Sequence, residues 1–283
     1  LGVDFLRSVN LGYRVPIGKK VVVIGGGNVA IDVALTALRT GAHAVDLVCL
    51  EAREEMPAHE WEIEDALEEG VVINCSWGPV AIMENNGTVS GVVVKKCTAV
   101  FDAQGKFNPT FDETITTTFQ ADTVIIAIGQ AADLSLFGEE AALLSAPGGL
   151  ITVDRVTLQT PLEGVFAGGD VVSGPASVVE AINFGHEAAI SIDRYVRGLD
   201  VRDGRPLAKP EPAARPDYRS FPKAPRQEAR KIPLAERRGT FKEITLTLTE
   251  EQAVAEAKRC LNCGLCCECF QCVAACGPKA VDH

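Results

Sequence analysis

The stretch Val21-Val22-Val23-Ile24-Gly25-Gly26-Gly27-Asn28-Val29-Ala30 decides the fold of this chain. It begins with a β-branched run, which is typical of a strand buried on both faces of a parallel sheet. Three glycines follow, and the residues after them predict a helix over Asn28–Thr40 that Gly41 closes. A buried strand, a glycine-rich turn and a helix in this order indicate α/β architecture.

The glycine turn has the spacing of a dinucleotide-binding site, because Gly25-x-Gly27-x-x-Ala30 fits the pattern G-x-G-x-x-G/A. The first glycine permits the tight turn, and the second lets the backbone approach a pyrophosphate. The small third residue lets helix and strand pack closely, and the helix N-terminus offers N–H groups to the anion. A purely structural turn is the alternative. The predicted nucleotide-binding residues here are Gly25, Gly26, Gly27, Asn28, Val29 and Ala30.

An acidic residue, Glu51, follows the next predicted strand, Val45–Leu50. A carboxylate there can accept hydrogen bonds from the adenosine ribose and would repel a 2′-phosphate, so it favours NADH over NADPH. Arg53 and the alanine at the third small position argue the other way, and Glu51 could also be an ordinary surface carboxylate. We therefore expect NAD(H), with NADP(H) possible, and include Glu51 and Arg53 in the predicted site.

Strand and helix signals continue to alternate over the first 200 residues. His59–Glu69 is predicted to be an acidic amphipathic helix, and Ala121–Gly129 another buried strand. Between them Asn86-Gly87 is a hairpin signal. The strands expected around that hairpin are Val71–Cys75, Val80–Glu84, Val89–Asp102 and Thr114–Gln120. The fold class is therefore α/β, with a Rossmann-like nucleotide-binding domain.

A second ligand signal lies in Gly164–Asp170, where a predicted buried strand ends in Gly168-Gly169-Asp170. Such an ending presents one carboxylate where the backbone can approach a ligand closely. Gly174-Pro175-Ala176-Ser177 then begins a helix predicted over Val178–Val196, whose N-terminus can face a ring carbonyl or a pyrophosphate.

Ala121–Gly129 together with Gly164–Asp170 resembles the pyridine nucleotide–disulfide oxidoreductase superfamily. More narrowly, Lys19–Ala37 and Arg53-Glu54-Glu55-Met56-Pro57-Ala58 resemble the small subunit of glutamate synthase and its relatives. The resemblance covers residues 1 to about 200 and implies that hydride passes from a nicotinamide to FAD. It implies that Asp170 binds the ribityl chain, and Gly129, Gly169, Ala176 and Ser177 complete the candidate flavin site.

The chain departs from the glutamate synthase pattern in several places. No FAD-binding fingerprint precedes Leu1, so we expect the adenosine half of the flavin site to lie outside this sequence. Leu50-Glu51 stands where NADPH-using relatives have paired arginines, and the cysteine cluster follows the flavin segment instead of preceding it. The nucleotide domain also has no C-x-x-C motif, which disfavours chemistry like that of thioredoxin reductase.

Seven of the ten cysteines lie in the last 24 residues. Cys266-x2-Cys269-x2-Cys272-x3-Cys276 has ferredoxin spacing, which lets thiolates converge on a four-iron cluster. The predicted ligands of [4Fe-4S] clusters are Cys260, Cys263, Cys266, Cys269, Cys272 and Cys276. Zinc is the alternative metal, and one cluster or two remain possible. Similar tails join glutamate-synthase-like modules to further flavoprotein modules, so the polypeptide is expected to continue beyond His283.

Composition limits the remaining function classes. The net charge of −11 argues against general nucleic-acid binding, and no stretch approaches 18 uninterrupted apolar residues. Residues 201–240 are basic and rich in proline, which is typical of an extended linker. We divide the chain into a connector (1–17), an NAD(P)-binding domain (18–131), the C-terminal part of an FAD-binding domain (132–200), a linker (201–249) and an iron–sulfur segment (250–283).

The sequence thus predicts a cytoplasmic electron-transfer oxidoreductase module. Electrons would pass from NAD(P)H through FAD to the clusters, and then to a redox partner protein or an adjacent domain of a larger complex. The alternatives are a glutamate synthase small subunit and a non-catalytic module that binds nucleotide and clusters. Hydride transfer needs placement and no general base, so no acid–base residue is assigned. Cys49, Cys75 and Cys97 are expected to be reduced core thiols.

Overall fold

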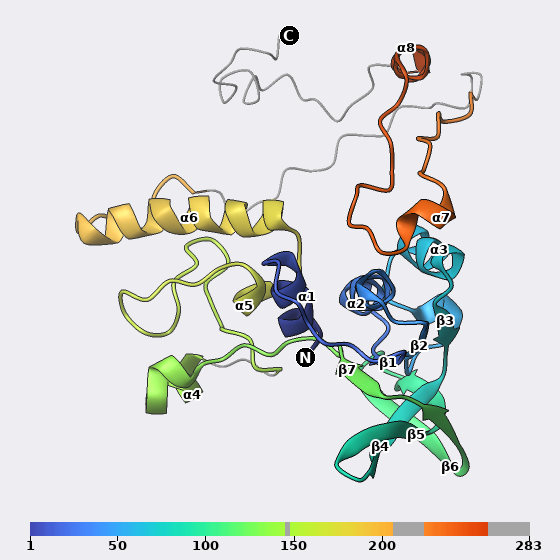
Figure 1. Cartoon of the computed structure of the whole chain (residues 1–283). Helices are drawn as coiled ribbons and strands as arrows, with labels where there is room; N and C mark the ends of the chain where they lie inside the picture. The colour runs from blue at the N-terminus through green and yellow to red at the C-terminus, as the bar shows by residue number, and fades with distance from the viewer. Residues whose placement is uncertain (145–147, 206–223, 260–283) are drawn as a thin grey trace. The chain divides into compact units, whose positions relative to one another are not determined.

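The computed structural model describes residues 1–144, 148–205 and 224–259, which belong to two compact units (Figure 1). The first unit combines Leu1–Gly129 with the described part of Phe221–Cys263, and the second is the described part of Gln130–Ser220. The predicted cluster ligands, from Cys260 to Cys276, lie outside the described residues. Within the described ranges, no helix is long and apolar enough to cross a membrane.

A four-stranded parallel sheet forms the centre of the first unit. Its order is β3-β2-β1-β7, and each neighbouring pair is parallel. The strands are β1 (Lys20–Ile24), β2 (Ala44–Val48), β3 (Val72–Asn74) and β7 (Thr123–Ile126). Val21, Val22 and Val23 of β1 are at most 1% exposed, so this strand is buried on both faces, as its β-branched run predicts.

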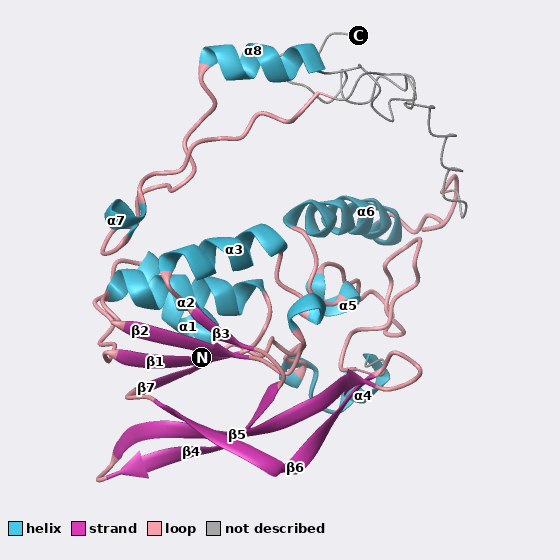
Figure 2. Cartoon of the chain, turned by 90° about the vertical axis from the view of Figure 1, so that its right-hand side faces the viewer, coloured by secondary structure: helices cyan, strands magenta, loops and turns pink. Residues whose placement is uncertain are grey.

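Three helices cover one face of this sheet (Figure 2). They are α1 (Gly2–Asn10), α2 (Asn28–Thr40) and α3 (Glu60–Glu69). The bounds of α2 confirm the helix predicted after the glycine turn, and His59 is the N-cap of α3 instead of its first residue. The helix α1 lies in the stretch that the sequence analysis treated as a connector, and its Phe5 joins the hydrophobic core.

The opposite face of the parallel sheet is covered by a three-stranded antiparallel sheet (Figure 2). Its strands are β4 (Trp77–Asn85), β5 (Thr88–Phe101) and β6 (Phe107–Gln120). Val92 and Val94 of β5 pack against Val22 and Ile24 of β1. The strand predicted at Thr114–Gln120 is too short, because β6 already begins at Phe107. Its first half has few apolar residues and is extended because it pairs with the end of β5.

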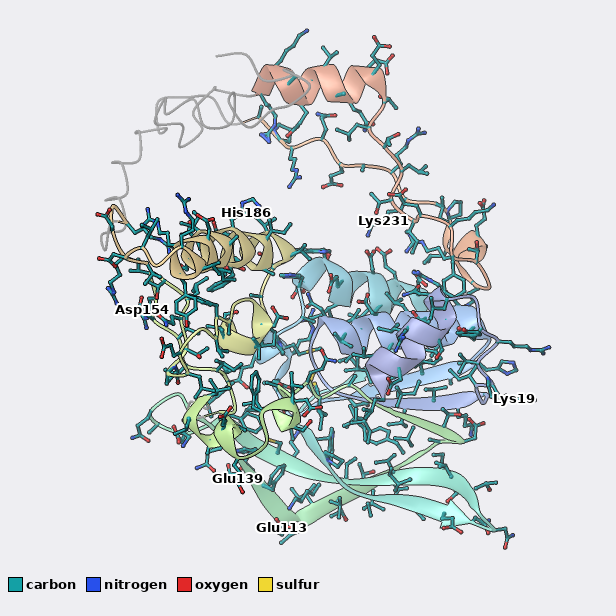
Figure 3. The ribbon with its side chains drawn as sticks, turned by 90° about the vertical axis from the view of Figure 1, so that its left-hand side faces the viewer. Lys19, Glu113, Glu139, Asp154, His186 and Lys231 are labelled. Carbon is teal, nitrogen blue, oxygen red and sulfur yellow. The ribbon has the colours of Figure 1, made fainter. Side chains whose placement is uncertain are left out.

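The C-terminal part of the first unit folds back onto α3. It contains the short helix α7 (Leu234–Arg237) and the helix α8 (Glu250–Arg259). The guanidinium of Arg237 donates to Glu68 at 3.1 Å, and Lys231, labelled in Figure 3, pairs with Asp65. The Thr249 hydroxyl, just before α8, accepts a hydrogen bond from the Gln252 N–H at 3.2 Å, which is the bond of an N-cap.

Arg237 is part of a buried ion-pair network. Its side chain is 5% exposed, and the side chain of Glu69 at the end of α3 is 2% exposed. Glu69 accepts hydrogen bonds from Arg39 of α2 at 2.8 and 3.3 Å, and its carboxylate also lies 4.0 Å from Arg237. These four groups, Arg39, Glu68, Glu69 and Arg237, are called the clamp below. It attaches the C-terminal segment to the nucleotide-domain helices.

The second unit is mostly helix and irregular loop. Its elements are η2 (Ser135–Glu140), α4 (Ala141–Leu144), α5 (Asp170–Ser173) and α6 (Val178–Val196), the last of which confirms a predicted helix. The predicted buried strand before Asp170 is wrong, because Phe166 makes only an isolated bridge to Gln159. Gly164 and Gly169 have φ values of +75° and +73°, which interrupt a regular strand there.

Candidate functional site

The glycine turn connects β1 to α2 at the carboxyl end of the parallel sheet. Gly25 donates its N–H to the Val48 carbonyl at 2.9 Å, so the turn starts as a continuation of the sheet ladder. The Gly26 carbonyl accepts the Ala58 N–H at 3.3 Å. Ligands of open α/β sheets bind outside the carboxyl ends of the strands, and the turn occupies that position.

The three glycines differ in how much room surrounds them. Gly25 has a φ of +142°, and a Cβ placed on it would lie 2.2 Å from the Ala127 carbonyl oxygen. A Cβ on Gly26 would lie 2.7 Å from Glu51 Oε2. A Cβ on Gly27 would meet only Pro57 Cγ, at 3.9 Å. Gly25 is therefore required by packing within the fold, a side chain at Gly26 would displace the end of the Glu51 side chain, and the fold itself has room for a side chain at Gly27.

Among the described residues, no side chain caps the N-terminus of α2. Gly27 is the N-cap residue, and the first turn contains no acidic residue. The Asn28 side chain is used elsewhere, because its Oδ1 accepts the His59 N–H at 3.0 Å. Val29 is 40% exposed, whereas Ala30 is fully buried beneath the turn. A helix N-terminus with free amides and no local acid is a favourable place for a phosphate anion.

Glu51 lies directly beside the turn, as the short approach of its Oε2 to Gly26 shows. Arg53, two residues on, begins the short helix η1 (Arg53–Glu55) and pairs with Glu60 at 2.6 and 3.1 Å. The hydrogen bonds that Arg53 donates to the Glu60 carboxylate raise the pKa of the Arg53 guanidinium. Arg53, which could have bound a 2′-phosphate, is thus paired with Glu60 in this structure, whereas the Glu51 carboxylate lies next to the turn.

Removal of the Glu51 carboxylate should therefore change nucleotide preference. For Glu51→Ala we expect the dissociation constant for NADH to rise about tenfold, the usual effect of losing a hydrogen bond to a charged group. The constant for NADPH should fall or stay unchanged, because a repulsive charge is removed. Equilibrium dialysis with both nucleotides measures this, with Glu54→Ala as the matched control. An equal loss of both affinities would contradict the assignment.

A second electrostatic feature lies between α2 and α3. Burial raises the pKa of Glu62, and the neighbouring Asp32 carboxylate raises it further. Burial also raises the pKa of Asp32 itself. Among the described residues, the buried Oε2 of Glu62 has no hydrogen-bond partner. A carboxyl whose pKa is higher in the folded state binds its proton more tightly there, so its ionisation destabilises the fold at higher pH.

We expect Glu62→Gln to raise the unfolding free energy at pH 7 by up to about 1 kcal/mol, because an ionised and unpaired carboxylate is removed. Near pH 3.5, about a unit below the model-peptide glutamate pKa, the wild-type carboxyl is already neutral and the gain should vanish. Denaturant unfolding at the two pH values tests this. The exposed Glu64→Gln on the same helix is the control, and a gain that is equal at both pH values would argue against it.

Four of the candidate flavin residues, Gly169, Asp170, Ala176 and Ser177, lie at the start of α5 and α6 in the second unit, and the fifth, Gly129, belongs to the first unit. A Cβ on Gly168 would lie 2.7 Å from Phe184 Cβ, so the backbone of Gly168 packs directly against α6. Asp170, two residues later, is the first residue of α5. The Asp170 carboxylate is exposed and has no ion pair or side-chain hydrogen bond among the described residues. A free carboxylate beside closely packed backbone fits a hydroxyl-rich ligand such as a ribityl chain.

Ser177 has a structural role in addition to its predicted one. Its hydroxyl accepts the Glu180 N–H at 3.2 Å, and the Glu180 carboxylate accepts the Ser177 N–H at 2.9 Å. The two bonds complete a capping box at the start of α6. The Ser177 N–H and the Ser177 hydroxyl, which donates to the same carboxylate at 2.7 Å, lower the pKa of Glu180. Ala176 is exposed just before this cap. Gly129, with a φ of +100°, lies beyond the end of β7, so the predicted strand over Ala121–Gly129 is too long at its C-terminal end.

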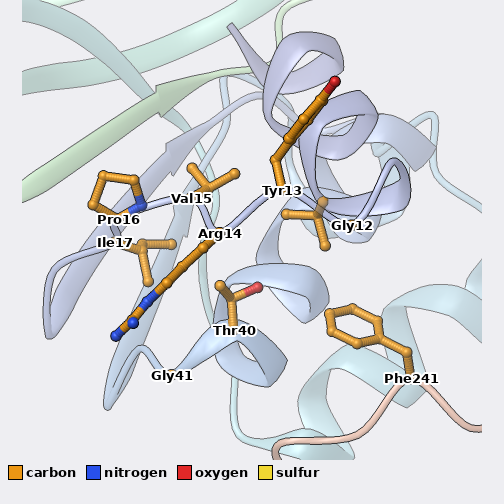
Figure 4. A pocket seen from close by; sticks show the side chains of 10 residues that line it. Gly12, Tyr13, Arg14, Val15, Pro16, Ile17, Thr40, Gly41 and Phe241 are labelled. Carbon is orange, nitrogen blue, oxygen red and sulfur yellow. The ribbon is translucent and has the colours of Figure 1, made fainter.

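A separate cavity of about 580 Å³ lies at the opposite end of α2 (Figure 4). It is bordered by Thr40 and Gly41, where α2 ends, and by Tyr13, Arg14 and Phe241. It therefore does not contact the glycine turn. Among the described residues, no group of three or more His, Cys, Asp or Glu side chains could hold a metal ion.

Two residues that contact the predicted site residues Glu51 and Arg53 could not be predicted from the sequence. These include Glu60, whose ion pair occupies Arg53, and Cys49, whose thiol contacts the Glu51 carbonyl oxygen at 3.7 Å. The seven-residue spacing between Arg53 and Glu60 is too long for an i,i+4 pair on one helix, so periodicity alone gives no signal for it. The ion pair between Arg53 and Glu60 forms because the fold brings η1 next to the start of α3.

The parallel sheet with its glycine turn has the Rossmann-like fold of a nucleotide-binding oxidoreductase, and comparison with known families agrees. Residues 2–185 match the model of the pyridine nucleotide-disulphide oxidoreductase family, so the chain belongs to that family. The chain is 23% identical to the thioredoxin reductase of T. acidophilum, with a TM-score of 0.50 over 64% of this chain and 53% of that one. This likeness concerns the fold alone.

Two curated relatives are more similar in sequence. The chain is 40% identical to the NADP(+)-dependent formate dehydrogenase subunit beta of Moorella thermoacetica, over 93% of this chain and 38% of that protein. It is 38% identical to the glutamate synthase [NADPH] small chain of Azospirillum brasilense, over 69% of this chain and 40% of that protein. The chain thus spans about two fifths of the length of each. The resemblance to the glutamate synthase small subunit is confirmed.

Proposed function

We propose that this chain is part of an electron-transfer oxidoreductase that takes electrons from NAD(P)H through FAD to [4Fe-4S] clusters and a protein partner. The observation that carries the proposal is the glycine turn. At this edge of the sheet, the N-terminus of α2 has no side-chain cap among the described residues, and the fold leaves room next to Gly27. The Glu51 carboxylate lies beside the same turn. This arrangement suits a pyrophosphate and an adjacent ribose.

Each part of the nucleotide would be bound by a different group of this chain. The backbone amides at the start of α2 would bind the pyrophosphate, and Gly27 would let it approach without steric overlap. Glu51 would accept hydrogen bonds from the adenosine ribose hydroxyls. In the second unit, Asp170 would bind the hydroxyls of the ribityl chain. FAD, when bound, supplies the change from hydride transfer to single-electron transfer.

We propose NADH as the preferred donor, because Glu51 stands beside the turn and Glu60 already occupies Arg53. The name of the Moorella relative specifies NADP(+) for that protein. The ratio of the dissociation constants for NADH and NADPH therefore decides which nucleotide this chain prefers. The Glu51→Ala variant described above tests whether Glu51 sets that preference.

The match to the formate dehydrogenase subunit extends over 93% of this chain, whereas the match to the glutamate synthase small chain extends over 69%. This supports a protein in which the cysteine-rich segment serves as the electron outlet, with the predicted ligands Cys260, Cys263, Cys266, Cys269, Cys272 and Cys276. The partner would be another domain or subunit of a larger redox complex.

The test is anaerobic reconstitution of the full chain with iron, sulfide and FAD, followed by addition of NADH or NADPH. We expect bound flavin and iron–sulfur absorption, and bleaching of both on addition of the nucleotide. Failure of both nucleotides to bleach a chain that holds flavin and clusters would contradict the proposal. A chain that binds nucleotide and clusters without any bleaching would support the non-catalytic alternative.

The similarity to the Azospirillum protein supports a second candidate, a glutamate synthase small subunit. The two functions differ in the electron acceptor. Glutamine-dependent formation of glutamate when the chain is mixed with a glutamate synthase large subunit would favour this candidate. If NADH reduces the chain but no glutamate forms, the result favours the electron-transfer oxidoreductase with another acceptor.

A further inference from the structure

Two cysteines lie side by side beneath the glycine turn. Val48 of β2 and Asn74 of β3 are register partners and the last residues of their strands, and Cys49 and Cys75 directly follow them. The ladder continues to this level, because the Cys49 N–H donates to the Asn74 carbonyl at 3.1 Å. Neighbouring strands are about 4.8 Å apart, and disulfides join Cα atoms about 4.4–6.8 Å apart, so the backbone spacing allows a bond.

Both side chains point to the same side of the sheet. Cys49 belongs to the core cluster between the sheet and its helices, and Cys75 packs against that cluster. The thiol of Cys75 also lies 3.9 Å from the sulfur of Met56 in the same cluster. Burial raises the pKa of the Cys49 thiol, and the neighbouring Cys75 thiol raises it further.

The pair is in direct contact with the proposed nucleotide site. The Cys49 thiol donates to the Glu51 carbonyl at 3.7 Å, and the Ser76 N–H donates to the same oxygen at 2.8 Å. A Cβ on Gly26 would lie 3.0 Å from Cys49 Cβ. A change in the position of the Cys49 side chain therefore affects both the backbone that holds Glu51 and the surface beneath the glycine turn.

We infer that Cys49 and Cys75 form a reversible disulfide by exchange with a low-molecular-weight disulfide such as glutathione disulfide, and that its formation weakens nucleotide binding. The second part rests on the proposed function, whereas the first does not. Cys75 is partly exposed and Cys49 only 2% exposed, so Cys75 is the thiol that an incoming disulfide reaches.

The exchange balances as follows. Cys75 loses its proton to solvent and attacks one glutathione sulfur, which breaks the glutathione disulfide and releases one glutathione thiolate. Cys49 then loses its proton and attacks the Cys75 sulfur, which releases the second glutathione. Two electrons pass from the cysteine pair to one glutathione disulfide, and excess reduced glutathione reverses both steps.

Trypsin separates the relevant cysteines. Cleavage after Lys and Arg places Cys49 in peptide 40–53, Cys75 in peptide 54–95 and Cys97 in peptide 97–106, with every tail cysteine in peptide 260–279. The full chain is equilibrated with mixtures of reduced and oxidised glutathione, alkylated, digested without reductant and analysed by mass spectrometry. We expect a link between peptides 40–53 and 54–95 that dithiothreitol removes.

The controls use the same digest. Cys75→Ser should leave peptide 40–53 unlinked, whereas Cys97→Ala, at a buried cysteine whose thiol donates to the Ala99 carbonyl at 3.4 Å, should leave the link intact. Peptide 54–95 found only as a glutathione adduct, or linked to peptide 260–279, would overturn the proposal. If Cys75→Ser does not fold, phenylarsine oxide serves instead: its arsenic should bridge peptides 40–53 and 54–95 of the reduced wild-type chain and be excluded after oxidation.

The effect on nucleotide binding is measured separately. We expect oxidation to raise the dissociation constant for NADH about fivefold, close to the loss of one modest hydrogen bond, and to leave Cys75→Ser unaffected. Equal constants for the oxidised and reduced wild-type chains would overturn the coupling. A reduced chain that binds neither NADH nor NADPH would instead contradict the proposed function, and the disulfide result would stand by itself.

Discussion

Gly27→Ala should reduce the affinity for NADH by about 10- to 100-fold and leave the melting temperature nearly unchanged. The Cβ of the alanine would meet only Pro57, at 3.9 Å, so the fold has room for it. Gly27 has a φ of −90°, which alanine adopts without strain. The methyl group would instead occupy the space through which the pyrophosphate approaches the amides of α2, and overlap of this kind costs about 1–3 kcal/mol.

Gly25→Ala is the matched comparison at the first glycine. Its φ of +142° and the contact of 2.2 Å with the Ala127 oxygen mean that this substitution should damage folding as well as binding. Isothermal titration with NADH and thermal unfolding of both variants measure the two effects. If Gly27→Ala binds NADH as well as the wild type does, the glycine turn is not the nucleotide site.

Glu69→Gln should lower the unfolding free energy by about 3–5 kcal/mol. The substitution keeps the size of the side chain but removes the charge that faces Arg39 and Arg237, whose side chains are 16% and 5% exposed. Breaking a buried ion pair by removing one partner is costly, because Arg39 loses the carboxylate with which it pairs and stays mostly out of water, while Arg237 retains Glu68. Chemical denaturation of the full chain measures the loss.

The pair between Lys231 and Asp65 provides the control, since it joins the same C-terminal segment to the same helix. Both of its side chains are more exposed than Glu69, and Asp65→Asn should cost only about 0–1 kcal/mol. Limited proteolysis should also show faster cleavage within residues 224–249 for Glu69→Gln than for Asp65→Asn. Similar stability losses in the two variants would show that burial does not strengthen the clamp.

Local sequence patterns predicted the parallel part of the fold well. The β-branched run of β1 and the glycines before α2 determine their own structure, because burial and backbone freedom act over a few residues. Prediction failed where structure depends on distant partners. The first half of β6 is extended only because β5 pairs with it, and the residues before Asp170 lack a partner strand within the described chain.

The site shows the same division. Motif spacing identified Gly25, Gly27 and Glu51, and the structure brings these residues together. It could not reveal that Glu60 occupies Arg53, because that pair forms between two separate helices. Cys49 and Cys75 are 26 residues apart in the sequence and meet only through the register of β2 and β3.

The clamp also has a consequence for how the chain is made. Glu69 and Arg237 are 168 positions apart, and the second unit lies between them in the sequence. At a synthesis rate of about 5–20 residues per second, roughly 10–30 seconds pass between the appearance of the two residues. During that interval Glu69 has Arg39 alone as its partner, and the face of α3 that receives α7 is uncovered. The first unit is therefore completed only after residues 130–220, which interrupt it in the sequence, have been synthesised.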